Sequence, residues 1–134
     1  MTLQIRVIAP DKIIWDATAD EIILPTSTGQ LGILKNHIPL LTALDIGVMR
    51  TRINKEWQPI ILLGGFAEIE NNIITILVNG AEEVKDIDVN EAQNELEKAT
   101  NIFTQAINNK EKIEATQNLR KARARLQAAN VMNN

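Results

Sequence analysis

The chain contains no cysteine and no tyrosine, and its 134 residues include a single serine, Ser27, and a single histidine, His37. Without cysteine it cannot form disulfides, thiolate metal sites or a cysteine nucleophile. One serine and one histidine leave most combinations of nucleophile, acid and base out of reach, and a lone histidine has no second histidine with which to share a metal. We therefore predict no catalysis within this chain, no metal site and no cofactor.

Long apolar runs are absent as well, since none reaches the roughly 18 residues that span a membrane. The first residues also lack the basic and apolar character of a leader segment. These two absences predict a soluble protein that works in the compartment where it is made. Its hydrophobic content of 45% is enough for one modest core with an appendage.

The hydrophobic period of the chain changes at Asp86. Before this residue, apolar residues alternate or run in short blocks, as they do in β-strands. After it, they are spaced three and four apart in two series, as they are along helices that pack on one another. The two series are Val89, Ala92, Leu96, Ala99, Phe103 and Ala106, then Ala115, Leu119, Ala122, Leu126 and Ala129. We therefore predict two units, residues 1–86 and residues 87–134.

The first unit is predicted to consist of short antiparallel strands separated by turn sequences. Gly64 and Gly65 interrupt one strand pattern, and they lack the lysine and serine or threonine of a phosphate-binding loop. A bulge or a close strand crossing is the better interpretation. The predicted strands span residues 3–7, 13–15, 19–25, 30–34, 46–53, 57–63, 66–70 and 73–78. Strands at this spacing without helices between them predict a β-sandwich, that is, a flattened antiparallel β barrel.

The second unit is predicted to be a C-terminal antiparallel α-helical hairpin that reverses at residues 108–110. Residues 81–98 carry seven acidic and two basic side chains, a balance of −5, whereas residues 110–125 carry six basic and two acidic ones, a balance of +4. The helices are therefore electrostatically complementary, although each surface pair is worth less than about 1 kcal/mol. Because alanine dominates the seam, we predict a lightly held hairpin, which a preference of about 5.5 kcal/mol for another state would switch.

The sequence TSTGQLGIL at residues 26–34 combines small polar residues with apolar ones. We expect its apolar members Leu31, Ile33 and Leu34 to lie in an exposed turn. Exposed apolar residues rimmed by polar ones indicate a contact surface. The residues alone do not identify what that surface contacts.

Four stretches of the chain closely resemble the epsilon subunit of rotary ATP synthases, above all its chloroplast and cyanobacterial branch. They are ILPTSTGQLGILKNHIPLLTALD at residues 23–45, LLGGFAEI at 62–69, ITILVNGAE at 74–82 and LRKARARL at 119–126. The likeness covers essentially the whole chain, in the same order. It implies the architecture that the periodicity also indicates, a flattened β-sandwich followed by two helices.

The resemblance implies a non-catalytic subunit of the central rotor. In the family the sandwich binds the gamma subunit and rests on the membrane rotor ring of c subunits, and so couples proton-driven rotation to the catalytic head. His37 corresponds to a rim position near gamma, although a surface or hydrogen-bonded structural role is the simpler interpretation of a lone histidine. The turn that faces the ring corresponds to Ser27, Thr28, Gly29, Gln30 and Leu31.

The same resemblance implies a location. Such a subunit is peripheral on the stromal face of the thylakoid membrane, or on the cytoplasmic face of a cyanobacterial one. It is membrane-associated only through the complex.

The resemblance also implies that the helices restrain ATP hydrolysis. In the family the hairpin opens and its helices extend along gamma into the catalytic head of alpha and beta subunits, where basic side chains meet acidic segments. A single helix over residues 88–130 would be about 60 Å long, enough to reach the head. The basic side chains predicted to make this contact are Arg120, Lys121, Arg123 and Arg125. The alternative is a solvated basic face that pairs with the acidic first helix.

A nucleotide-binding motif of some bacterial members is only partly present at the start of the first helix. Ile87, Asp88 and Ala92 match it, but Glu91 stands where the motif has arginine and would repel a polyphosphate. We therefore expect any regulation by ATP to act through other subunits. Asp88 also has a structural interpretation as a helix N-cap, with Glu91 as its capping-box partner.

Two other classes of function stay in view as alternatives. A nucleic-acid-binding protein could use the basic run at residues 119–126, but the net charge is −3 and no aromatic residue interleaves with that run, so we expect no nucleic acid partner. An enzyme could use the carboxylates of Glu68 and Glu70. Because these lie two residues apart in a predicted strand, they would share its outer face, as solvated pairs do.

Overall fold

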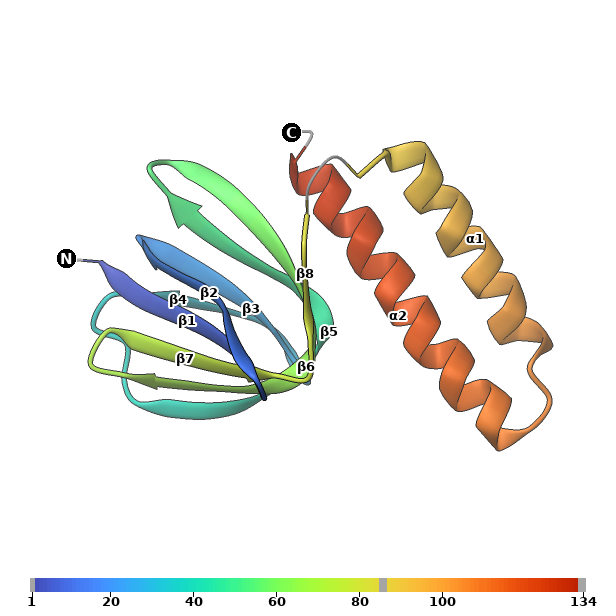
Figure 1. The fold of residues 1–134 in the computed structure, drawn as a ribbon, viewed down its shortest axis with the longest axis horizontal. Coiled ribbons are helices and arrows are strands. Elements are labelled where there is room, and N and C mark those ends of the chain that lie inside the picture. Colours follow the sequence, from blue (N-terminus) through green and yellow to red (C-terminus); the bar gives the residue numbers. More distant parts are fainter. Residues whose placement is uncertain (1, 85–86, 133–134) are drawn as a thin grey trace.

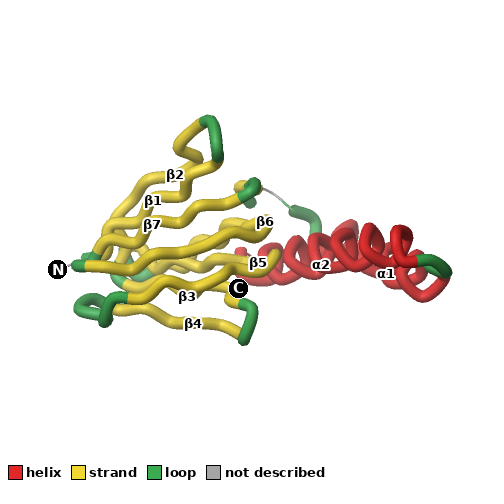
Figure 2. Tube along the Cα trace, turned by 90° about the horizontal axis from the view of Figure 1, so that it is seen from below, coloured by secondary structure: helices red, strands yellow, loops and turns green. Residues whose placement is uncertain are grey.

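The computed structural model describes residues 2–84 and 87–132, which form eight strands followed by two helices (Figure 1). The strands are β1 (Leu3–Ala9), β2 (Lys12–Ala19), β3 (Glu21–Thr26), β4 (Gly29–Leu34), β5 (Leu40–Ile53), β6 (Glu56–Glu70), β7 (Ile73–Val78) and β8 (Ala81–Glu83), and the helices are α1 (Val89–Gln105) and α2 (Asn109–Met132). The predicted fold class, a β-sandwich followed by an antiparallel helical hairpin, is confirmed. Figure 2 shows the helices projecting from the block of strands as a separate arm. The predicted boundary after residue 86 lies outside the described residues.

The strands form one sheet in the order β2-β1-β7-β6-β5-β3-β4, with β8 also paired to β6. The long strand β6 has different neighbours at its two ends, because residues 65–70 pair with β7 and residues 60–62 pair with β8. Among the described strands, every pairing is antiparallel except that of β1 with β7, which is parallel. The flattened antiparallel barrel therefore contains one parallel pairing that the sequence did not indicate. β1 and β7 are far apart in the sequence, so no hairpin turn determines their relative direction.

Two-residue turns set the register of β5, β6 and β7. Asn54 and Lys55 have φ of 51° and 69°, and Asn71 and Asn72 have φ of 53° and 64°. Pairs of left-handed residues form the hairpin turns that match the twist of the adjacent strands, and asparagine tolerates this conformation well. The strand ends predicted on either side of these two turns lie within one residue of the observed ones.

Two predicted features of β5 and β6 are wrong. β5 begins at Leu40 rather than at residue 46, and β6 continues through Gly64 and Gly65, where an interruption was expected. Both strands are extended by pairing with their neighbours rather than by local preference. A Cβ atom at Gly65 would lie 1.9 Å from the carbonyl oxygen of Leu77. The predicted close approach of strands is therefore confirmed, and it requires glycine.

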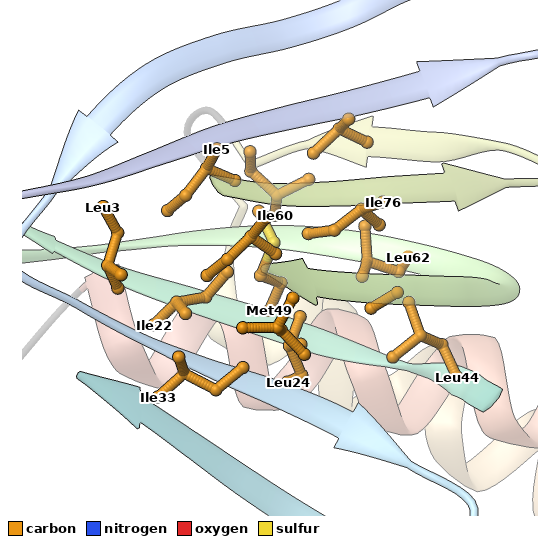
Figure 3. Close-up of a cluster of buried hydrophobic side chains, with 14 of the residues drawn as sticks. Leu3, Ile5, Ile22, Leu24, Ile33, Leu44, Met49, Ile60, Leu62 and Ile76 are labelled. Atoms are coloured by element: carbon orange, nitrogen blue, oxygen red, sulfur yellow. The ribbon is translucent and has the colours of Figure 1, made fainter. Parts of the chain in front are cut away.

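The core of the sandwich follows from the alternation of side chains along the strands. In β1, residues 3, 5, 7 and 9 are buried whereas residues 4 and 6 are exposed. Leucine, isoleucine and methionine side chains from the two layers meet in the space between them (Figure 3). The labelled members of this cluster are Leu3, Ile5, Ile22, Leu24, Ile33, Leu44, Met49, Ile60, Leu62 and Ile76.

Helix α2 lies between the sandwich and α1 (Figure 1). Its residues Ala124 and Ala128 are buried against Val48, Ile61 and Val84 of the sandwich. The predicted seam of the second helix lies on the opposite side of α2, at 3.6 residues per turn, and so packs on α1. Because both faces are covered, α2 does not have the single apolar stripe of an ordinary surface helix.

The reversal between the helices occupies residues 106–108, two residues before its predicted place at 108–110. Asn108 ends it, because its side-chain oxygen accepts a hydrogen bond from the backbone N–H of Glu111 at 2.8 Å. The Glu111 carboxylate in turn accepts one from the backbone N–H of Ile107 at 3.2 Å. This reciprocal arrangement satisfies donors that a helix N-terminus otherwise leaves free.

Candidate functional site

The predicted ring-facing turn lies at the tip of the β3–β4 hairpin. Ser27 and Thr28 are its two loop residues, and both are exposed together with Gly29 and Gln30. The Thr26 hydroxyl holds the turn, because it donates to the carbonyl oxygen of Gly29 at 2.5 Å and accepts from the backbone N–H of Thr28 at 3.4 Å. The polar part of the predicted contact surface is therefore presented to solvent.

The apolar part of this segment differs from the expectation. Ile33 is fully buried, and Leu31 is half-buried and packs against the core, whereas Leu34 is exposed. The expectation of an exposed apolar surface is therefore wrong for Ile33 and largely wrong for Leu31. The segment is a strand rather than a loop, and residues 31 and 33 share its inward face.

An apolar surface that sequence reasoning missed crosses the outer face of the sandwich. The register aligns one apolar residue from each of β5, β6, β7, β1 and β2, namely Ala43, Phe66, Leu77, Ile8 and Ile13, which we call the outer row. Phe66, Leu77 and Ile13 are each more than half exposed. Alternation places each residue outward, but their alignment depends on the strand order and could not be read from the sequence. A contiguous exposed apolar surface of this kind commonly marks an interface.

His37 lies in the loop between β4 and β5. It is half-buried, and its Nδ1 is 2.7 Å from the carbonyl oxygen of Ile38, to which it donates as the Nδ1–H tautomer. Its neighbours Ile38 and Leu41 are 74% and 70% exposed. Leu41 precedes Ala43 by two residues in β5 and so shares the outer face. Leu41 therefore extends the apolar surface along β5, while the histidine itself has a hydrogen-bonded role.

The helical hairpin is held by few large apolar contacts. Ala124 and Ala128 are the α2 residues buried against the sandwich. In the seam, Leu119 is 5% exposed, but Phe103 is 41% exposed, and Ala92 is the buried residue of α1. A fully buried leucine or phenylalanine contributes about 1.5–3 kcal/mol, and alanine contributes less because it has little apolar surface. Ion pairs and hydrogen bonds therefore contribute a larger share of the docking free energy than they would under a helix with large buried apolar side chains.

The basic residues of α2 have different partners. Arg125 makes a bidentate ion pair with Glu82 of β8, with Nε–Oε2 at 3.1 Å and Nη2–Oε1 at 2.9 Å. Its Nη1 lies 3.6 Å from an Oε2 of Glu95 in α1. Arg120 Nη1 lies 3.6 Å from Asp45 Oδ1 in β5. The hydrogen bonds to Glu82 raise the pKa of the Arg125 guanidinium, although partial burial opposes this.

The other two basic residues are less engaged. Arg123 is exposed and lines a groove with Arg50 and Leu126, whereas Lys121 is half-buried. The four predicted residues therefore do not form one patch in the folded hairpin. Among the ion pairs of the described residues, one joins α2 to α1 and two join α2 to the sandwich. The acidic partners of α2 lie largely on the sandwich, because α2 is the inner helix.

The residues that match the nucleotide motif have structural roles. The Asp88 carboxylate accepts a hydrogen bond from the backbone N–H of Asn90 at 2.8 Å and is the N-cap of α1. Ile87 packs on the cluster between α2 and the sandwich, and Ala92 is buried. Glu91 is exposed in the first turn, where a carboxylate interacts favourably with the helix dipole.

The part of the chain that the structure describes contains no group of three or more histidine or acidic residues that could hold a metal ion. None of its helices is long and apolar enough to cross a membrane. Glu68 and Glu70 are both exposed on the outer face of β6, where the sequence placed them.

Comparison with known proteins matches the two halves of the chain to the two domains of one protein family. The family described as "ATP synthase, Delta/Epsilon chain, beta-sandwich domain" matches residues 2–84, and that described as "ATP synthase, Delta/Epsilon chain, long alpha-helix domain" matches residues 85–130. The "ATP synthase epsilon chain, chloroplastic" of Gracilaria tenuistipitata var. liui is 72% identical over 134 residues, 100% of each chain. The "ATP synthase epsilon chain" of Thermosynechococcus vestitus is 58% identical over 132 residues, 96% of each chain.

A solved structure shares the fold. A chain in the cryo-EM structure of Euglena gracilis mitochondrial ATP synthase, OSCP/F1/c-ring in rotational state 1, matches with a TM-score of 0.80 at 21% identity. The match covers 96% of this chain and 81% of that one. A sandwich followed by a helical hairpin is therefore a fold already seen in a chain of a solved assembly.

Proposed function

Since the chain belongs to the ATP synthase delta/epsilon family, we propose that it is a non-catalytic subunit of the central rotor with two tasks. The sandwich couples rotation of the membrane rotor ring to the catalytic head through the gamma subunit. The helical hairpin restrains ATP hydrolysis. The chloroplastic and cyanobacterial relatives favour a peripheral position on the stromal face of a thylakoid, or the cytoplasmic face of a cyanobacterial membrane, through the complex alone.

The observation that carries the coupling task is the outer row. It offers gamma an apolar strip across five strands, continued along β5 by Leu41. The centre of a stable interface is rich in such side chains, with polar groups at its rim. The β3–β4 turn, residues 27–31, is the separate polar contact that we assign to the loops of the c subunits.

Replacement of Phe66 by serine tests this assignment. Phe66 stands in the middle of the outer row, and loss of a central aromatic anchor weakens an interface by roughly tenfold or more. We expect that loss in the affinity for gamma, measured by titration of the purified subunits. Ile73→Ser is the matched control, because Ile73 is exposed on the same face but pairs outside the outer row. Equal affinities of Phe66→Ser and the parent would exclude this face as the gamma site.

The restraining task rests on the basic residues of α2. We propose that Arg120, Lys121, Arg123 and Arg125 meet acidic segments of the beta subunits once the hairpin opens. Charged pairs that leave water at an interface can contribute strongly to affinity. The arginines at 120 and 125 must first leave their partners in the folded hairpin.

The test is ATP hydrolysis by an epsilon-depleted catalytic head, titrated with the parent chain and with a variant carrying alanine at these four positions. We expect saturable inhibition by the parent and weaker inhibition by the variant. A second variant with alanine at Lys110 and Lys112 removes positive charge from the other end of α2 and should inhibit like the parent. Equal inhibition by all three would discard the charge mechanism and leave the rotor assignment, whereas absence of binding and inhibition would overturn both.

A further inference from the structure

We propose that Glu82 and Glu95 bind Arg125 in the resting state and so hold the hairpin against the sandwich. We call this three-residue arrangement the latch. The acidic segments of the catalytic head must then displace these carboxylates to engage the same guanidinium. This inference rests on the proposed inhibitory role of α2 and specifies how its resting state is set. The charge pattern indicated that acidic residues of segment 81–98 pair with the basic ones of segment 110–125, and the structure identifies Glu82 and Glu95 as the two that bind Arg125.

The geometry singles out Glu82 among the acidic residues. Both of its carboxylate oxygens accept hydrogen bonds from Arg125, at 2.9 and 3.1 Å, so the pair has the fork arrangement that is the strongest type of ion pair in proteins. Glu82 belongs to β8, which pairs with β6 and is therefore anchored in the sandwich. Glu95 approaches the same guanidinium from α1, at 3.6 Å. Arg125 of α2 thus connects this helix both to the sandwich and to α1.

In the apolar contact around this pair, α2 contributes only small buried side chains. On the face of α2 that packs on the sandwich, the buried residues are alanines, at positions 124 and 128. The side chains of Arg125 and Glu82 are 39% and 37% exposed, so a competing carboxylate can reach them before the helix has fully left the sandwich. A latch of this kind is released by exchange of partners rather than by breaking the ion pair in isolation.

Salt rather than neutral pH should govern the arginine side of the latch. Because the pKa of Arg125 is raised in the folded state, the stabilisation it provides is complete below its unfolded pKa and is lost only as pH rises through the folded one. Arg125 therefore stays charged throughout the neutral range. Added salt, in contrast, screens partly exposed pairs.

The absence of cysteine from the chain allows a direct measurement of undocking. Ala128→Cys places a single thiol on the face of α2 that packs on the sandwich, at a position that is 0% exposed, so its reaction with a maleimide reports the fraction of undocked helix. In this background we expect Glu82→Gln to react about three to ten times faster, the range for a partly exposed but bidentate pair. Arg125→Lys should show a smaller increase, because lysine keeps the charge but cannot form the fork.

Two controls separate the latch from general loss of stability. Glu97→Gln removes a carboxylate from an exposed position of α1 and should leave the rate unchanged. Ala67→Cys places the thiol in the sandwich core instead, where Glu82→Gln should not alter its reactivity. Equal rates for Glu82→Gln and the parent at position 128, or an equal acceleration at positions 67 and 128, would overturn the latch.

Titration of the catalytic head separates this inference from the proposed function. Glu82→Gln should inhibit ATP hydrolysis at three- to tenfold lower concentration than the parent, because the competitor for Arg125 has lost its charge. Faster labelling together with unchanged inhibition would overturn the competition with the head. Absence of inhibition by the parent and every variant would overturn the proposed function, while the labelling rates would still decide whether Glu82 holds the hairpin.

Discussion

At the scale of the residue, a few backbone positions determine how neighbouring strands approach and where they turn. Gly65 has φ of 148° and faces the carbonyl of Leu77 across the β6–β7 pairing. The turns at residues 54 and 71–72 are a second case, in which asparagine tolerates a left-handed backbone conformation. The residue type at such positions is determined by backbone sterics and not by hydrophobicity. They therefore interrupt the hydrophobic pattern of a strand, or end the strand, while the sheet continues.

Gly65→Ala is expected to destabilise the sandwich strongly. The added methyl group would lie 1.9 Å from a backbone oxygen that belongs to the adjacent strand and cannot move alone. We expect a loss of about 3 kcal/mol or more in the free energy of unfolding, measured by urea denaturation. Gly32→Ala is the control, because nothing lies within 4 Å of its Cβ position, and it should change stability by less than about 0.5 kcal/mol. Similar losses for both variants would contradict the close-approach argument.

At the scale of the element, α2 differs from an ordinary surface helix because it has two covered faces. One carries Ala124 and Ala128 against the sandwich, and the other carries the seam with α1. Leu119 is the large side chain of that seam that is well buried. The outer helix, α1, therefore depends on α2 for its place, whereas α2 is held from both sides.

Leu119→Ala should loosen α1 from α2. Truncation of a buried leucine costs about 2–5 kcal/mol, and the lower end applies where the neighbours can relax, as in this small seam. We expect hydrogen exchange of the α1 backbone amides to accelerate by at least tenfold while the strands keep their protection. Ile113→Ala, at a 60% exposed position of the same helix, should leave exchange nearly unchanged. Uniform acceleration in the strands and helices would show that the two parts unfold together.

At the scale of the whole molecule, the proposed tasks lie on different surfaces. The outer row is on the face formed by β5, β6, β7, β1 and β2, whereas α2 covers Val48, Ile61 and Val84. The surface that we propose for gamma and the docking site of the hairpin therefore use separate residues. This separation allows the hairpin to open while the sandwich stays in place.

Removal of all residues after 86 is accordingly expected to preserve binding to gamma and to abolish inhibition of ATP hydrolysis. The outer row is built entirely from strands, so its alignment does not need the helices. The measurement is a gamma-binding titration beside an ATP hydrolysis assay, with the intact chain as control. Because truncation exposes the apolar patch under α2, the folded state of the truncated chain is first checked by its thermal transition. A folded truncated chain that no longer binds gamma would contradict the division of labour.

Much of the architecture could be predicted from the sequence because it depends on local physics. The change of hydrophobic period predicted strands first and helices after them, and the asparagine-containing turns at residues 54–55 and 71–72 predicted where β5 ends, where β6 begins and ends and where β7 begins. The strand β8 was missed, because its three residues are too few to show a period. The early start of β5 was missed too, because it is stabilised by pairing with β6 and not by its own pattern.

The candidate functional residues likewise divide into those that the sequence alone indicates and those that only the tertiary structure brings together. The sequence by itself determined which residue types are present, where the exposed polar turn lies and that α2 carries a basic run. Only the tertiary structure decided that five residues from five strands form the outer row, and that Arg125 meets Glu82, 43 positions away in the chain. The physical reason is that periodicity is a property of consecutive residues, whereas strand order and helix docking bring together residues whose separation along the chain carries no signal.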